Sequence, residues 1–245
     1  MNHVETFPAL REIAVVRHGF IGRIPDLDVK VERALALARL DEFHIAARAH
    51  TGLADRAFIT AEQVHGGEVA TVDFQTTAPV ANADGLITND PRVCLGIHVA
   101  DCGPVFIVDP ALRVIALLHS GRKSTDLGIT TIAIEKMRHE FGCDPARLVV
   151  QLGPCIRPPL YETDFAAAIL AQARAAGVRA VHDCGTCTGE NVERYYSYRV
   201  ERGKTGRLLA FLALTCGGGR APSTSHHTRH APRSVVTSGF DASRL

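Results

Sequence analysis

The stretch Ala83–Gly121 decides the fold, and it reads ADGLITNDPRVCLGIHVADCGPVFIVDPALRVIALLHSG. It contains three apolar runs, at Val93–Val99, Pro104–Val108 and Val114–Leu118. Each run is short, rich in β-branched residues and bounded by Asp, Asn, Gly or Pro, a pattern typical of buried strands joined by tight connections. The sequence therefore predicts three buried strands at the centre of the fold.

Metal-capable side chains stand at the edges of the apolar runs. Cys102 lies in ADCGP, His119 lies in LLHSG, and His65 lies upstream in QVHGGEV. A buried His or Cys is more often an ordinary core residue than a ligand. Three of them, each at the edge of an apolar run, make this region the first candidate for a functional site.

Further periodic segments surround these strands. Helical spacing of apolar residues among good helix formers predicts helices over Val29–Leu40, Ser124–Phe141, Asp164–Ala176 and Glu190–Arg202. Short apolar runs predict strands at Leu10–Val16, Ala57–Thr60, Glu68–Val72, Leu148–Leu152 and Val178–Val181, and Leu208–Leu214 is also apolar. Strands and helices are therefore mixed along the chain.

Composition limits the class of protein. The chain has 245 residues, 46% of them apolar, and a formal net charge of +1, so a large core is expected and a nucleic-acid partner is not. No apolar run reaches about 18 residues, which argues against a membrane span. The start of the chain lacks the basic and apolar segments of a secretion signal, so we expect a cytoplasmic protein whose seven cysteines are reduced.

The composition changes after Cys216. Residues 217–245 are rich in Gly, Pro, Ser and Thr and have no sustained period. We expect residues 1–216 to form a single domain and residues 217–245 to form a disordered tail, whose histidines are solvated. Deleting the tail is then expected to leave the melting temperature nearly unchanged.

An ordered set of motifs resembles a known family. QVHG, ADGLIT, ADCGPVFIVDP, HSG and LGPCI with YE follow one another between Leu10 and Leu214, and CTGENVERYYSYRVERGKTGR comes near the end. The set resembles the laccase-domain family, also labelled YfiH. Its members were first called multicopper polyphenol oxidases and were later assigned purine nucleoside phosphorylase activity. The resemblance implies a catalytic domain of the α/β (α+β) class, a compact sandwich of mixed β-sheets flanked by helices.

The resemblance also implies a zinc site made by His65, Cys102 and His119. The chemistry of these residues agrees, because Zn²⁺ takes nitrogen and sulfur ligands in a tetrahedron. Three protein ligands leave the fourth position open, as in catalytic zinc sites, where a bound water has a pKa of about 7. Copper is the less favoured alternative, because three ligands supply one metal whereas multicopper chemistry needs several centres.

The implied reaction is phosphorolysis of adenosine, inosine or methylthioadenosine, with adenosine deamination as a side activity. The partners are then a purine nucleoside and phosphate, and the oligomeric state stays open. Arg and Lys suit phosphate because they donate charge-assisted hydrogen bonds. We assign substrate or phosphate binding to Arg23, Lys123 and Arg199. Catalytic roles are assigned to Asp101, Cys102 and Arg122, with Asp101 as an acid–base group or as a support for Cys102.

Two segments depart from the family pattern and keep other functions open. The family commonly carries His-Ala-Gly-Trp-Arg-Gly where this chain has HSGRKS, and this chain has no Trp. IPDLDV replaces a Gly-Gly-Val-Ser stretch near the N-terminus. Both segments are expected to shape the substrate pocket. One alternative is a cysteine hydrolase or amidase that uses Cys102 with a nearby His, and another is a non-catalytic, divergent paralogue that binds nucleosides or a partner.

Other polar residues receive simpler interpretations. Cys184 and Cys187 form a CxxC without a second pair, which favours a structural or incidental role over a redox pair or half of a zinc site. Cys155 is interpreted as a small buried hydrophobe. His98, inside an apolar run, is interpreted as a core histidine, and His18 in RHGF is a weak candidate to reach the site from a loop.

Overall fold

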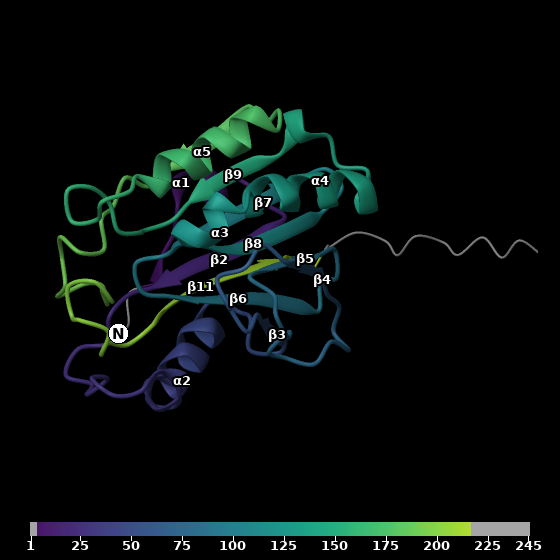
Figure 1. Cartoon of the computed structure of the whole chain (residues 1–245). Helices are drawn as coiled ribbons and strands as arrows, with labels where there is room; N and C mark the ends of the chain where they lie inside the picture. The colour runs from purple at the N-terminus through teal and green to yellow at the C-terminus, as the bar shows by residue number, and fades with distance from the viewer. Residues whose placement is uncertain (1–3, 217–245) are drawn as a thin grey trace, which may run out of the picture.

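Two mixed β-sheets pack face to face in the computed structural model, which describes residues 4–216 (Figure 1). The first sheet has the strand order β1 (Val4–Glu5), β2 (Val16–Ile21), β11 (Leu208–Leu214), β6 (Val93–Val99) and β3 (Ala57–Thr60). The second has the order β10 (Ala180–Asp183), β9 (Val149–Leu152), β7 (Gly103–Asp109), β8 (Val114–Ser120), β5 (Gly85–Thr88) and β4 (Val69–Thr71). Each sheet combines parallel and antiparallel pairs.

Helices cover the outer faces of the two sheets. Helix α2 (Arg33–His50) lies against the first sheet, and α4 (Ile129–Phe141) and α5 (Phe165–Ala175) lie against the second (Figure 1). Among residues 4–216 there are also three short helices: α1 (Pro8–Arg11), α3 (Arg122–Asp126) and the 3₁₀ turn η1 (Pro145–Arg147). This architecture confirms the predicted α+β sandwich of mixed sheets flanked by helices.

The central strands are apolar along their whole length because both of their faces are buried. In β7, Phe106 and Val108 belong to the core between the sheets, whereas Val105 and Ile107 belong to the core under α4 and α5. Side chains alternate across a strand, so a strand covered on both sides reads as a continuous apolar run. This explains the runs seen in the sequence, and the three strands predicted from them are confirmed.

The pairing of β7 with β8 brings the predicted site residues together. The two strands are antiparallel neighbours, and Pro104 at the start of β7 lies opposite His119 near the end of β8. Cys102 comes just before β7 and therefore lies beside His119. In β8, Ile115 and Leu117 face the core between the sheets, so the two-residue period places His119 on that same face.

Some predicted elements differ from the observed ones at their boundaries. Leu10–Val16 is predicted as a strand, but its first residues belong to the short helix α1, and the strand begins only at Val16. The predicted helix over Ser124–Phe141 is divided into α3 and α4 at Gly128, whose φ of +78° lies outside the helical range. A new helix then begins on a different axis and packs on β8.

The helix predicted over Glu190–Arg202 is wrong. This segment is a series of turns in which Tyr195, Tyr196 and Ser197 are all buried. Three consecutive side chains of a surface helix cannot all face one core, so burial favours an irregular path. The hydroxyl of Tyr196 accepts a hydrogen bond from Ile24 N–H at 3.1 Å, which ties the segment to the N-terminal region.

Two further predictions concern the ends of the chain and membranes. The tail predicted at residues 217–245 lies outside the described residues. Within residues 4–216, no helix is long and apolar enough to cross a bilayer.

Candidate metal centre and active site

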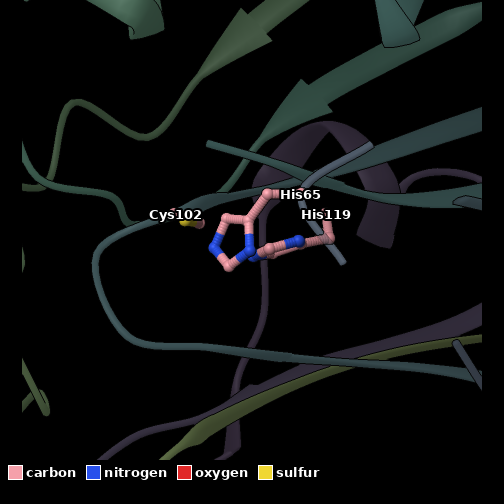
Figure 2. A group of neighbouring side chains, drawn as sticks. All are labelled: His65, Cys102 and His119. Carbon is pink, nitrogen blue, oxygen red and sulfur yellow. The ribbon is translucent and has the colours of Figure 1, made fainter. Parts of the chain in front are cut away.

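His65, Cys102 and His119 converge at one end of the sandwich, as Figure 2 shows. His65 lies in the loop before β4, Cys102 precedes β7 and His119 is the penultimate residue of β8. Their ligand atoms all lie within 4.8 Å of one another, and no other group of three or more His, Cys, Asp or Glu residues within 4–216 meets this geometry. Two imidazoles and a thiol at this spacing fit a tetrahedral zinc ion after small side-chain adjustments.

Asp84 orients His119 for this role. Its Oδ1 lies 2.7 Å from His119 Nδ1, and its side chain is fully buried. A carboxylate on one imidazole nitrogen holds the ring in the tautomer that leaves the other nitrogen free to bind a metal. The His119 Nε2 is therefore available to the cluster, which supports the fit of these residues to a metal ion.

Asp84 also shapes the loop that carries His65. Its Oδ1 accepts a hydrogen bond from His65 N–H at 2.9 Å, and its Oδ2 accepts from Gly66 N–H at 2.6 Å and Val64 N–H at 3.1 Å. Burial would raise the pKa of this carboxyl, but the hydrogen bonds from His119 and from these amides outweigh burial and lower it. Asp84 is not among the site residues predicted from the sequence, although it lies in ADGLIT immediately before a buried strand.

Gly121 leaves the space that the Cys102 sulfur occupies. A Cβ atom at position 121 would lie 2.5 Å from Cys102 Sγ, closer than real contacts allow. Asp101, just before Cys102, has a φ of +84°, a left-handed conformation that non-glycine residues rarely adopt. The backbone is thus held in an unusual turn that directs Cys102 toward the two histidines.

The cluster favours charged forms of its side chains. Burial would raise the pKa of Cys102, but the charge of His119 and hydrogen bonds with His119 and His65 lower it below its usual value. Burial would lower the pKa of His119, but Cys102 and Asp84 raise it. A thiolate is the form that both a metal ion and nucleophilic chemistry require.

The cluster opens into a cavity of about 1020 Å³ with a strongly cationic lining. Six arginine or lysine side chains line it, against two aspartates, Asp101 and Asp126. The six cations are Arg33, Arg122, Lys123, Arg199, Arg202 and Arg207. The near-neutral charge of the whole chain therefore conceals a local positive field that suits an anionic ligand.

Arg207 is the most enclosed of these cations. Its guanidinium Nη1 donates to the carbonyl oxygens of Thr205 and Gly206, at 2.9 Å and 2.8 Å, which fixes the side chain. Burial and the positive charge of Arg33 lower the pKa of Arg207. The negative charge of a Cys102 thiolate acts in the opposite direction and raises it. Two arginines thus lie close together beside the cluster. Neither arginine is among the site residues predicted from the sequence, although Arg207 lies in the Thr-Gly-Arg motif.

Two of the residues predicted to bind substrate or phosphate, Arg23 and Arg199, have other partners. Arg23 does not line the cavity, because its guanidinium pairs with Glu201 at 2.7 Å and lies over the Tyr196 ring. Arg199 lines the cavity but pairs with Glu162 at 2.5 Å. The geometry therefore does not support Arg23 as a phosphate ligand, and it gives Arg199 a competing partner.

Asp101 lines the cavity with its carboxylate already engaged. Its Oδ1 accepts from Thr188 Oγ1 at 2.7 Å, and its Oδ2 accepts from Ser197 Oγ at 3.1 Å and from Arg199 N–H at 2.7 Å. Both oxygens of the carboxylate are therefore occupied by donors from the protein itself. Asp101 therefore joins the turn of Cys102 to the segment before β11, which favours the support role over the acid–base role.

Arg122 and Lys123 lie on the wall formed by α3 and are exposed. The Arg122 side chain is 53% exposed and faces Asp126 at 3.9 Å. Within residues 4–216, Lys123 has neither a hydrogen bond from its ammonium group nor an ion pair. Both residues therefore remain available to a ligand that enters the cavity.

Another part of the cavity wall is aromatic rather than cationic. Tyr161 and Phe165 meet edge to face with ring centroids 5.6 Å apart, and the Arg199 guanidinium lies 4.7 Å from the Tyr161 ring centroid. Tyr198 and Ile156 also line this space. A planar heterocycle can stack on such a surface.

The remaining histidines and cysteines are placed as follows. His18 lies in the core, where its Nε2 accepts a hydrogen bond from Phe7 N–H at 2.8 Å, so it does not reach the site. His98 is partly buried, and burial lowers the pKa of its imidazole to about 3, but the residue also lines the cavity. Cys155 is fully buried, as expected, and forms a β-bridge with Cys187. Cys184 and Cys187 are both free thiols.

Comparison with known proteins agrees with the motif order. A family model described as multi-copper polyphenol oxidoreductase laccase matches residues 38–166 and 161–215. The chain belongs to this family. A family relative from Streptomyces coelicolor, named purine nucleoside phosphorylase, is 32% identical over 179 residues, which cover 62% of this chain and 73% of the relative. YlmD from Geobacillus stearothermophilus, also named purine nucleoside phosphorylase, is 29% identical over 197 residues, covering 63% and 71%.

Solved structures of family proteins share the fold. The crystal structure of YlmD from Geobacillus stearothermophilus superposes with a TM-score of 0.72 at 23% identity, covering 83% of this chain and 93% of YlmD. The crystal structure of Bacillus licheniformis YfiH gives a TM-score of 0.70 at 21% identity, covering 82% and 93%. These likenesses confirm the two-sheet sandwich.

Proposed function

We propose that this protein is a zinc-dependent purine nucleoside phosphorylase that cleaves the N-glycosidic bond of adenosine, inosine or methylthioadenosine with inorganic phosphate. The observation that carries the proposal is the joining of three features in one cavity: the His65–Cys102–His119 cluster, the enclosed Arg207 and the aromatic surface around Tyr161. The names of the family relatives support the same reaction class.

Arg207 and Arg33 are our candidates for the phosphate ligands. Phosphorolysis requires a dianion held close to C1′ of the sugar while water is excluded. Arg207 suits this task better than Arg122, because its side chain is fixed by two carbonyls and lines the same cavity as Cys102. Guanidinium groups also match two phosphate oxygens at once.

The aromatic surface is our candidate for the purine site. Stacking on Tyr161 and Phe165 would place the base beside Arg199, with the sugar between this surface and the phosphate held by Arg207 and Arg33. As the C1′–N9 bond breaks, its electron pair moves to the base, which must then gain a proton. Solvent is our candidate for the source of this proton, because burial lowers the pKa of the cavity-lining His98 to about 3 and keeps its imidazole neutral.

Metal identity belongs to the same proposal. The donor set of two imidazoles and one thiolate fits zinc, and a single three-donor cluster within residues 4–216 does not supply the several centres of multicopper chemistry. When bound, zinc supplies a Lewis acid beside the reacting groups. Asp84 holds His119 and the His65 loop in the geometry that such an ion needs.

Steady-state kinetics of the zinc-loaded protein test the proposal. We expect release of free base to depend on phosphate, and we expect Arg207→Gln to raise the KM for phosphate more than the KM for nucleoside. Lys204→Gln is the control, because Lys204 is exposed and does not line the cavity. Equal effects of Arg207→Gln on both KM values would contradict the assignment of phosphate to Arg207.

A cysteine hydrolase is the second candidate, because the half-buried Cys102 lies close to His119 and has a lowered pKa. A hydrolase of this kind uses the free thiolate as its nucleophile. The two candidates differ in the effect of metal. Added zinc should raise phosphorolysis and should protect Cys102 from alkylation, whereas it should inhibit a cysteine hydrolase.

A further inference from the structure

The cationic lining exceeds what inorganic phosphate requires. With Arg207 and Arg33 assigned to phosphate under the proposed function, Arg122, Lys123 and Arg202 remain in the same cavity. Within the described residues, 4–216, neither Lys123 nor Arg202 has a side-chain hydrogen bond or ion pair. A neutral nucleoside would leave Lys123 and Arg202 without an anionic partner in the cavity, whereas an anionic substituent would supply one.

Arg33 and the pair Arg122 and Lys123 come from different sides of the fold. Arg33 begins α2, which covers the first sheet, whereas Arg122 and Lys123 begin α3, which packs on β8 of the second sheet. Figure 1 shows α2 and α3 on opposite sides of the two sheets. A ligand in the cavity is therefore approached by positive charge from two walls.

The shape of a β-nucleoside matches this arrangement. The base and the 5′ carbon lie on the same face of the ribose, and a nucleophile that displaces the base attacks C1′ from the other face. Inorganic phosphate held by Arg207 and Arg33 then lies on one side of the sugar. A substituent at the 5′ position lies on the opposite side, toward the wall that carries Arg122 and Lys123.

We propose that the preferred substrate is a purine nucleoside 5′-monophosphate, whose phosphate is bound by Arg122 and Lys123. The proposal rests on the proposed phosphorolysis. In the reaction, an oxygen of inorganic phosphate forms a bond to C1′ and the C1′–N9 bond breaks. The electron pair stays with the base, which takes up a proton. The products are the free purine and ribose 1,5-bisphosphate, and no oxidant or reductant is needed.

Three substrates and a matched pair of variants test this proposal. The kcat/KM is measured at saturating phosphate for adenosine, adenosine 5′-monophosphate and adenosine 3′-monophosphate. The two monophosphates carry the same charge, but the 3′ group lies on the other face of the ribose. We expect the 5′-monophosphate to exceed adenosine and the 3′-monophosphate by about tenfold or more, as expected for charge-assisted hydrogen bonds.

The variant R122Q/K123Q should lower the ratio of kcat/KM for the 5′-monophosphate over adenosine by about tenfold. Lys30→Gln is the control and should keep the ratio, because Lys30 is exposed and lies outside the cavity lining. Melting curves check the fold of the double variant, and the single variant Lys123→Gln, with a smaller expected fall, replaces it if the double variant does not fold.

The outcomes separate this proposal from the proposed function. Cleavage of adenosine at least as fast as of the 5′-monophosphate would overturn the nucleotide proposal and leave phosphorolysis standing. An unchanged ratio in the folded variants would overturn the assignment to Arg122 and Lys123. Absence of phosphate-dependent cleavage with all three substrates would overturn the proposed function and the nucleotide proposal together.

Discussion

Replacing Asp84 by Asn changes one buried atom at the point where the histidines of the cluster are held. Asp84 Oδ1 accepts from His65 N–H and lies 2.7 Å from His119 Nδ1, and Oδ2 accepts from Val64 N–H and Gly66 N–H. An amide turns one of these oxygens into an NH₂ group. Whichever oxygen is replaced, two N–H donors lose their acceptor and face another donor.

The magnitude follows from these contacts. A buried hydrogen bond to a charged group contributes about 1.5–3 kcal/mol, so loss of two should lower the free energy of unfolding by about 3–6 kcal/mol. For a chain of this size, 1 kcal/mol corresponds to about 2–4 °C in melting temperature, so a decrease of at least about 6 °C is expected. Zinc affinity should fall about 10–100-fold, because His119 loses the group that fixes its tautomer.

Two measurements check the Asp84→Asn prediction. The chain has no tryptophan, so urea unfolding of the chelator-treated protein is best followed by circular dichroism. Zinc affinity is measured by competition with a chromophoric chelator. Asp55→Asn is the matched control, because the Asp55 side chain is 79% exposed, and it should change stability by less than about 0.5 kcal/mol. An Asp84→Asn protein with the stability and zinc affinity of the control would refute this account of Asp84.

Two other substitutions test zinc binding and the pH dependence of stability. Gly121→Ala places a Cβ 2.5 Å from Cys102 Sγ, so it should weaken zinc binding at least tenfold. The metal content after dialysis measures this loss. Full retention of zinc would contradict the prediction and show that the turn relaxes around the added methyl group. Burial lowers the pKa of His18 to about 4, and the nearby Arg11 charge adds to the shift. Because the unfolded chain takes up this proton first, about 3 kcal/mol of stability present above pH 6.5 should be lost as pH falls toward 4. Urea unfolding of metal-free protein should give a flatter pH profile for His18→Gln than for wild type, and identical profiles would contradict this.

The fold was largely predictable because the central strands are buried on both faces. Continuous runs such as Val114–Leu118 are typical of strands between two layers, and they locate the core without any knowledge of pairing. Glu190–Arg202 was not predictable, because its apolar residues pack as consecutive buried side chains of an irregular segment. Local helix formers there are overruled by tertiary contacts such as the one between Tyr196 and Ile24.

The three metal-capable residues of the candidate site could be predicted from the sequence, but the residues that support them and line the cavity could not. His65, Cys102 and His119 differ from their apolar neighbours, so a sequence can identify them. Asp84 acts through backbone amides and a histidine 35 residues away, and such contacts leave no spacing to recognise. Arg207 and Arg23 look alike as charged residues, and only the fold separates a cation beside the cluster from one paired with Glu201.

The central claim is phosphorolysis, and the most direct test is the identity of the sugar product. Zinc-loaded protein is incubated with adenosine and inorganic phosphate, and ³¹P NMR and chromatography follow the reaction beside a Cys102→Ala control. We predict adenine and ribose 1-phosphate in equal amounts, with loss of both in the control. Adenine with unphosphorylated ribose, inosine alone, or no product from the zinc-loaded protein would contradict the claim.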